Sequence, residues 1–278
     1  MGAEGIAIVA GRGALPRLIA EDCRRRGQPY RVVLFEGVEL DWLAGHPVLR
    51  AVFEKPGRLF ADLRAAGCGI VTFAGGMARP RLNPLRFDLK LVSLAPRIFS
   101  GLRAGDDATL RMVAELFEAE GLTIRAPHEI LTSLLSPAGV LTRAQPSEAD
   151  RADAARAASI VEALGLADAG QGAVVAQGIC LGLESIQGTD AMLDFVAATA
   201  GPFRPDPDGA KGLLYKAPKP GQDWRVDLPA IGAETIRRAA AAGLGGVAVR
   251  AGGVLIIGRE EAIAAADAAG LFLWGIAP

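Results

Sequence analysis

The sequence contains few of the residues from which proteins build metal centres and disulfide frameworks. Its 278 residues include only two histidines and three cysteines. The two histidines, His46 and His128, exclude a multi-histidine metal site and argue against a Ser-His-Asp triad. An odd number of widely spaced cysteines, with no CxxC pair, is typical of a reducing compartment rather than of a disulfide scaffold or a structural zinc site.

The sequence also lacks an excess of charge of either sign and a long apolar run. Lys and Arg number 30 and Asp and Glu 31, which gives a formal net charge of −1. This balance argues against nucleic acid as the main partner, because phosphate binding favours a basic surface. No stretch reaches the roughly 20 apolar residues that span a bilayer. Glu4 stands where a signal peptide has Lys or Arg. We therefore expect a cytoplasmic protein, in at most peripheral contact with a membrane.

Apolar runs and helical patterns alternate along the first half of the chain. Strands are predicted at residues 6–10, 30–35 and 69–73, and helices at residues 15–26, 57–66 and 106–120. This alternation is typical of a parallel sheet that is covered by helices on both faces. We therefore predict an α/β protein whose N-terminal domain is Rossmann-like.

A second α/β pattern follows a stretch that is rich in Pro, Gly and Ser. That stretch, SPAGVLTRAQPS at residues 136–147, is predicted to be a domain linker. Ser147 is the predicted N-cap of the helix that follows it and reaches Leu164. Further strands are predicted at residues 173–183, 213–216, 247–250, 254–257 and 271–276, and helices at residues 189–199, 233–242 and 260–269. The predicted domains are therefore residues 1–135 and 148–278.

The sequence AGRGALP, at residues 10–16, occupies the place of the phosphate loop in a Rossmann sheet. Backbone N–H groups near Gly11 and Gly13, at the start of a helix, would suit a pyrophosphate. Glu36, after the second predicted strand, would then hold a ribose hydroxyl. However, the dinucleotide fingerprint has a third glycine where this chain has Pro16. A tight turn that binds no ligand explains the glycines equally well.

Two acidic pairs stand where helices are predicted to begin. Asp106-Asp107 follows a glycine, and so does Thr189-Asp190. Helix capping accounts for both pairs, and metal or hydroxyl binding is the alternative function.

Basic residues follow the third predicted strand. Arg79, Arg81, Arg86 and Lys90 come shortly after Gly75-Gly76 and are predicted to lie in a solvated loop. The alternative is a ligand site, because α/β proteins bind ligands at strand ends.

The segment KAPKPGQDWRVDLPAIG, at residues 216–232, combines opposed charges with three prolines. If residues 222–228 are extended, Asp223, Arg225 and Asp227 share one face, and Lys216 and Lys219 approach around the proline bend. Lys and Arg suit phosphate oxygens, and Asp suits Mg²⁺. The segment therefore indicates a preorganised anion and metal site, with a structural network of ion pairs as the alternative.

The sequence resembles the LpxI family along essentially its whole length. The resemblance rests on FAGGMARP, GDDATLR, DAGQGAVV, QGTDAML and, above all, KAPKPGQDWRVDLPAIG. It implies hydrolysis of UDP-2,3-diacylglucosamine, in lipid A biosynthesis, to UMP and 2,3-diacylglucosamine 1-phosphate (lipid X). It further implies Mg²⁺ as cofactor and a C-terminal catalytic domain that closes with the Rossmann-like domain around a lipid-linked nucleotide sugar.

The resemblance also implies roles for single residues. The family's catalytic aspartate corresponds to Asp227, with Asp223 and Arg225 beside it, and the two aspartates are the implied metal ligands. The implied substrate contacts are Lys216, Lys219, Gln222, Thr189, Asp190, Gly11 and Gly13. This chain departs from the family at Gly76, where relatives carry a polar residue.

Two rival functions belong to other classes. The Rossmann-like half would also suit an NAD(P)-dependent oxidoreductase, against which the Pro16 break counts. A non-catalytic protein that binds nucleotide sugars is the second rival. The sequence leaves open contact with the cytoplasmic face of the inner membrane and assembly as a homodimer.

Overall fold

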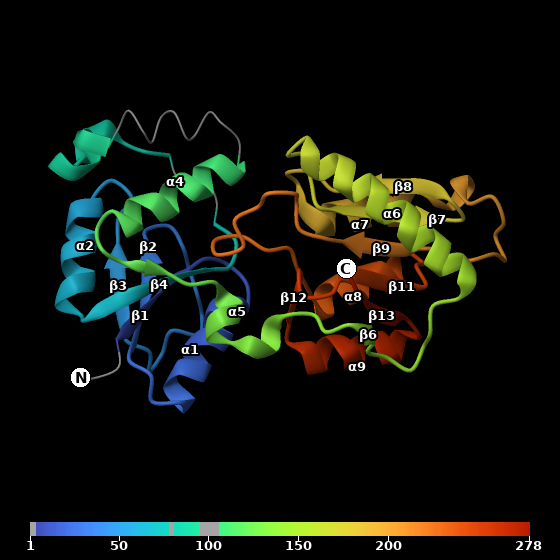
Figure 1. Cartoon of the computed structure of the whole chain (residues 1–278), viewed down its shortest axis with the longest axis horizontal. Coiled ribbons are helices and arrows are strands. Elements are labelled where there is room, and N and C mark those ends of the chain that lie inside the picture. The colour runs from blue at the N-terminus through green and yellow to red at the C-terminus, as the bar shows by residue number, and fades with distance from the viewer. Residues whose placement is uncertain (1–3, 78–80, 95–105) are drawn as a thin grey trace. The chain divides into compact units, whose positions relative to one another are not determined.

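The computed structural model describes residues 4–77, 81–94 and 106–278 (Figure 1). The chain forms two compact units: unit 1 is Met1–Thr132 with Asp223–Asp227, and unit 2 is Ser133–Gln222 with Leu228–Pro278. Residues 223–227, late in the sequence, therefore belong to the unit that the first half builds. Arg79 of the predicted basic patch lies outside the described residues, as do the side chains of Asp106 and Asp107.

Unit 1 is built on one sheet in which every strand pairing is parallel. Its five strands have the order β3-β2-β1-β4-β5, which confirms the predicted Rossmann-like domain. The apolar run of β1 is buried at every position, as expected of a strand covered on both faces. The strands are β1 (Gly5–Ala10), β2 (Tyr30–Phe35), β3 (Val48–Ala51), β4 (Cys68–Ala74) and β5 (Thr123–Ile124).

Helices cover both faces of this sheet. Leu63 of one helix and Phe117 of another pack with Val9 and Val71 in a single apolar cluster. The first helix packs against β1 and β2 through Ile19 and other residues that lie outside that cluster. The helical segments of unit 1 include α1 (Leu15–Arg25), α2 (Pro56–Ala65), η1 (Pro84–Arg86), α4 (Asp106–Glu118) and α5 (Pro127–Ile130), and residues 89–94 are also helical; η2 (Thr132–Leu134) follows.

Unit 2 contains a mixed sheet of six strands with the order β6-β13-β11-β9-β7-β8. Strands β9, β11 and β13 are parallel, and the other pairings are antiparallel. A separate parallel pair joins β10 and β12. The strands are β6 (Gly139–Val140), β7 (Gly172–Ala176), β8 (Ile179–Leu183), β9 (Leu213–Lys216), β10 (Ala230–Gly232), β11 (Gly246–Arg250), β12 (Leu255–Ile257) and β13 (Phe272–Ile276). These elements confirm the predicted second α/β pattern.

The two faces of the six-stranded sheet carry separate apolar clusters. Val175 packs with Val161 of α6, whereas its neighbour Val174 packs with Leu193 of α7 and Ile236 of α8. Adjacent strand residues point to opposite faces, so one apolar strand serves both clusters. The helical segments are α6 (Glu148–Leu166), α7 (Gly188–Thr199), η3 (Gly201–Phe203), α8 (Ala233–Ala241) and α9 (Arg259–Ala269). Ser147 caps α6 as predicted, in a capping box with Asp150.

The segment predicted as a linker, residues 136–147, differs from that prediction. It is part of unit 2, where β6 pairs with β13 at the edge of the sheet. The Thr142 hydroxyl accepts a hydrogen bond from the backbone N–H of Leu273 (2.9 Å). Pro, Gly and Ser hide any regular spacing of apolar residues in this segment. A strand of only two residues can form without such spacing.

Candidate functional site

The condition that residues 222–228 are extended, on which the shared face of Asp223, Arg225 and Asp227 depended, is not met. The chain turns at residues 224–226, and the backbone N–H groups of Val226 and Asp227 both donate to the carbonyl of Asp223 (3.2 Å each). The Asp223 carboxylate accepts the backbone N–H of Arg225 (Oδ1, 3.0 Å). Asp side chains commonly bond their own backbone two residues on and so stabilise a turn. This local bond competes with an extended conformation, and here it prevails.

The turn brings Asp223 and Arg225 together, although not by the strand alternation that we predicted. Arg225 Nε lies 3.0 Å from Asp223 Oδ1 and Nη2 lies 2.7 Å from Oδ2. These side-chain hydrogen bonds hold the pKa of Asp223 below its usual value, and burial opposes them. Arg225 also donates to Glu118 of α4 (2.6 Å), and Val226 packs against the apolar cluster of unit 1 that contains Phe117. Residues 223–227 are therefore anchored to α4.

Asp227 follows this turn and is half-buried. In the described part of the chain, no three His, Cys, Asp or Glu side chains are placed to hold a metal ion. Asp223 does not fit as a metal ligand, because both of its carboxylate oxygens bond the Arg225 guanidinium. Asp227 fits, because Mg²⁺ is commonly held by one or two carboxylates together with phosphate oxygens of a substrate.

Lys216, at the end of β9, lies in a buried polar cluster of unit 2. Its ammonium donates to Glu184 Oε1 (3.2 Å) and to Thr189 Oγ1 (2.6 Å). The Thr189 hydroxyl in turn donates to Glu184 Oε1 (2.9 Å). We call Lys216, Glu184 and Thr189 the lysine triad. Capping does not explain Thr189, because α7 begins without a side-chain cap.

The other predicted contacts of unit 2 lie in similar pairs. Lys219 donates to Asp168 (2.7 Å) and keeps 9% of its side chain exposed. Gln222 is buried, and its Oε1 accepts the backbone N–H of Lys219 (3.0 Å). Asp190 is exposed and lies 3.7 Å from Arg238. Both lysines of the motif thus have acidic partners, as the ion-pair alternative expected.

The glycine loop after β1 has a packing reason for its composition. A Cβ at Gly11 would lie 2.5 Å from the carbonyl oxygen of Gly76, and Gly13 has a φ of +97°. Arg12 and Gly76 exchange backbone hydrogen bonds (2.7 and 3.1 Å), which joins the loop to the end of β4. A Cβ at Gly76 would meet no atom within 4 Å, so a side chain would have room at this position.

Glu36, the expected ribose ligand of a dinucleotide enzyme, pairs instead with Arg86. The Arg86 Nη2 donates to Glu36 Oε2 at 2.5 Å. This hydrogen bond lowers the pKa of the Glu36 carboxyl. Because Arg86 occupies the carboxylate, Glu36 does not support the oxidoreductase alternative.

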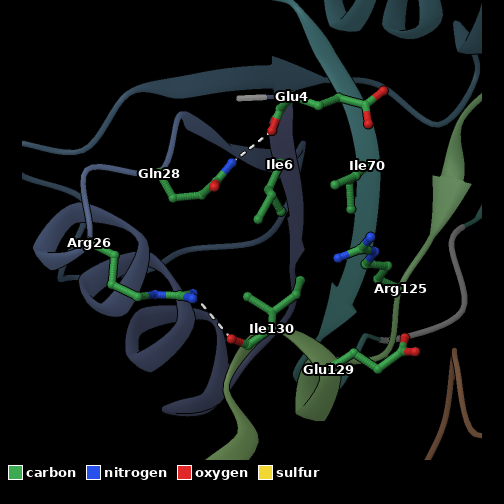
Figure 2. A pocket seen from close by; sticks show the side chains of 8 residues that line it. All are labelled: Glu4, Ile6, Arg26, Gln28, Ile70, Arg125, Glu129 and Ile130. Carbon is green, nitrogen blue, oxygen red and sulfur yellow. Dashed lines mark hydrogen bonds between the residues drawn. The ribbon is translucent and has the colours of Figure 1, made fainter. Parts of the chain in front are cut away.

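Unit 1 contains a cavity of about 300 Å³ that is lined by other residues (Figure 2). Ile6 and Ile70, near the amino ends of β1 and β4, form part of its wall, and Arg125 and Glu129 stand beside it. Ligands of α/β sheets bind at the carboxyl ends of strands, which is the opposite end. None of the predicted site residues lines this cavity.

The partners of the two lysines escaped the sequence reasoning. Glu184 directly follows an apolar strand, and Asp168 opens the motif DAGQGAVV. Glu184 could have been found from the sequence, because a carboxylate at the end of a strand lies at an edge where ligand sites form. Their contacts bridge 32 and 51 residues, which no local pattern reveals.

Comparison with known proteins agrees with these motifs. The family models for the LpxI N-terminal and C-terminal domains match residues 5–134 and 137–274. The chain is 40% identical over 273 residues to a protein of Caulobacter vibrioides named UDP-2,3-diacylglucosamine pyrophosphatase LpxI, and the match covers 98% of each chain. The chain belongs to the LpxI family. The resemblance seen in the sequence is thereby confirmed. No helix among the described residues of this LpxI family member is long and apolar enough to cross a membrane.

Proposed function

We propose that this protein hydrolyses the pyrophosphate bond of UDP-2,3-diacylglucosamine, releasing UMP and 2,3-diacylglucosamine 1-phosphate. The supporting observation is 40% identity, over 98% of both chains, to a relative named for this activity. Incubation of the purified protein with this substrate and Mg²⁺, followed by chromatography of the nucleotides, tests the proposal. UMP should accumulate with the wild-type protein and not with Asp227→Ala. A folded wild-type protein that forms no UMP under these conditions would refute it.

Arg225, Asp227 and the glycine loop each suit a step of this reaction. Cations near a pyrophosphate stabilise the charge that builds on its oxygens as the P–O bond breaks. Arg225, with 44% of its side chain exposed, is available for that role while Asp223 orients it. Asp227 would orient the attacking water and accept its proton. Gly13 would present its backbone N–H group to a phosphate, whereas the Gly11 N–H is donated to the carbonyl of Ala74 (2.7 Å).

We further propose Mg²⁺ as the cofactor, held by Asp227 together with phosphate oxygens of the substrate. When bound, the ion would neutralise charge on the pyrophosphate. Asp223 is left out of this ligand set, because its oxygens are occupied by Arg225. Titration with Mn²⁺ as a paramagnetic probe, in the presence of UMP to supply phosphate oxygens, should show a site on the protein that Asp227→Asn abolishes and Asp223→Asn retains.

A non-catalytic nucleotide-sugar binding protein is the second candidate function. The pairing of Lys216 and Lys219 with acidic residues would suit a static binding surface as well as a catalytic one. Turnover decides between the two functions, because a binding protein would retain the UDP-sugar unchanged and tolerate Asp227→Asn with little loss beyond affinity.

The proposed substrate carries two acyl chains, so we also propose peripheral contact with the cytoplasmic face of the inner membrane. Leu85 and Leu89, four residues apart, are 95% and 91% exposed, and Val92 is 56% exposed. Arg81 precedes them in the sequence, and Arg86 and Lys90, which pair with Glu36 and Glu120, lie between them. Apolar side chains beside cations suit a lipid–water interface. Leu85→Ser with Leu89→Ser should reduce flotation with anionic vesicles, and unchanged flotation would contradict this contact.

A further inference from the structure

Glu184, which no motif singled out, is the buried centre of the lysine triad. It directly follows β8, and its backbone N–H donates to the carbonyl of Gly172 at the start of β7 (2.9 Å). Its Oε1 accepts from both Lys216 and Thr189 (3.2 and 2.9 Å). The Glu184 and Lys216 side chains retain only 7% and 4% of their exposure. One carboxylate oxygen thus holds residues of β9 and α7 together.

The other oxygen of Glu184 gives the triad its unusual character. Oε2 is buried and makes no hydrogen bond within the part of the chain that the structure describes. A buried carboxylate oxygen without a donor destabilises a protein, and an apolar pair of similar volume commonly serves stability better than a buried ion pair. Stability therefore does not explain why an ion pair, rather than an apolar pair, occupies this place.

The backbone around Glu184 is shaped to admit its side chain. A Cβ at Gly172 would lie 2.3 Å from Oε2, and one at Gly170 would lie 2.0 Å from the Glu184 carbonyl oxygen. Both glycines belong to DAGQGAVV, the motif that opens β7. Any larger residue at Gly172 would push the carboxylate away from its present position. The position of Glu184 is thus fixed from two sides.

The triad lies at the edge of the sheet where ligands are expected. Lys216 is the last residue of β9 and pairs with Val249 of the parallel strand β11. Strand β11 ends one residue later. Thr189 lies in the first turn of α7. Carboxyl ends of parallel strands together with amino ends of helices form the usual ligand edge of α/β sheets.

We propose that Glu184 is a positioning residue for the hydrolysis proposed above, on which this inference rests. It acts as the fixed counter-ion of Lys216 and aims the lysine and the Thr189 hydroxyl at the substrate. An ammonium group has three N–H donors. Two of them point to Glu184 and Thr189, which leaves one for a phosphate oxygen of the substrate, reached through the 4% of the lysine side chain that stays exposed. Glu184 itself does not touch the substrate.

A mutant cycle tests this role through two readouts, the unfolding midpoint and the separate values of kcat and KM. Glu184→Gln leaves the Lys216 charge without its buried partner, so we expect a lower midpoint and a kcat reduced up to roughly 10²-fold, the cost of a misplaced group. Adding Lys216→Met removes the unpaired charge, so the midpoint should recover while kcat stays low. Glu184→Asp should restore part of kcat.

Two further variants keep the test decisive. Gly172→Ala leaves every charge in place but displaces the carboxylate, so it should lower kcat without removing a group. Asp153→Asn is the matched control. Asp153 is a buried carboxylate of unit 2 that accepts the backbone N–H groups of Gln177 and Gly178 (2.8 and 2.7 Å). It should lower the midpoint and leave kcat unchanged.

The outcomes separate this inference from the proposed function. If kcat does not change in Gly172→Ala, then Glu184 has only a structural role and the inference is wrong. If the wild-type protein releases no UMP, the proposed function fails first. A kcat that falls in Gly172→Ala but not in Asp153→Asn supports the positioning role.

Discussion

The two charged clusters of this protein are built in opposite ways. In unit 1, Asp223 and Arg225 are held by a turn of a few residues, and 44% of the arginine side chain meets solvent. In unit 2, Lys216 and Glu184 come from strand ends 32 residues apart and are almost fully buried. The first cluster therefore depends on local hydrogen bonds in water, and the second on the fold of the whole unit.

This difference separates the consequences of mutation. Removing one partner of an exposed pair costs little, because water solvates the charge that remains. Removing one partner of a buried pair leaves a charge that water cannot reach. Substitutions in the turn should therefore affect activity with little effect on folding, whereas substitutions in the lysine triad should affect both.

The largest effect is expected at Asp227, which belongs to the turn segment. Asp227→Ala removes the group proposed to orient and deprotonate water, so kcat should fall by roughly 10²–10⁴, while KM changes much less. Steady-state kinetics on the folded variant measure both constants. A kcat within a few-fold of the wild-type value would contradict the role of Asp227, and an unfolded variant would show instead that its charge supports the structure.

The contrast between the clusters is sharpest in the free energy of unfolding. Lys216→Met leaves Glu184 buried without its counter-ion, which should cost about 3–5 kcal/mol. Arg225→Met should cost about 1 kcal/mol or less, as exposed ion pairs contribute little. Urea denaturation followed by circular dichroism gives both values. Similar losses in the two variants would show that the clusters do not differ as their burial indicates.

Metal removal should act on catalysis and not on the lysine triad. Dialysis against EDTA should reduce turnover roughly 10²-fold, since the ion is expected to supply several kcal/mol of transition-state stabilisation. The unfolding midpoint should stay almost constant, because the lysine triad needs no metal. Added Mg²⁺ should restore activity. Undiminished turnover in excess EDTA would exclude a metal cofactor.

The sequence predicted the elements of the fold better than the geometry of the site. Strand β1 was found because a run that is buried on both faces is apolar at every position. The turn after Asp223 was missed because an alternation of polar and apolar residues does not by itself distinguish a strand from a turn. The hydrogen bond from the backbone N–H of Arg225 to the Asp223 side chain decides for the turn. Val226 attaches its segment to unit 1 by packing against an apolar cluster that contains Phe117. The sequence does not show this contact, because a single apolar residue forms no repeating pattern.

The smallest effect concerns the acid stability that Asp223 contributes. Its pKa is held below the usual value, first by hydrogen bonds from the Arg225 side chain. Such a carboxyl stabilises the fold above its unfolded pKa, near ~3.9, and this contribution disappears as the pH falls through the folded value. The unfolding free energies of the wild-type protein and Asp223→Asn should therefore differ near neutral pH and converge as the pH falls through the lowered pKa of folded Asp223. Asn keeps an oxygen for the turn, so the difference isolates the charge.

Asp62→Asn is the matched control, because Asp62 meets Arg58 at 3.6 Å on an exposed helix face and should show almost no difference at either pH. A difference at Asp223 that persists unchanged in acid would mean that shape, and not charge, stabilises the turn.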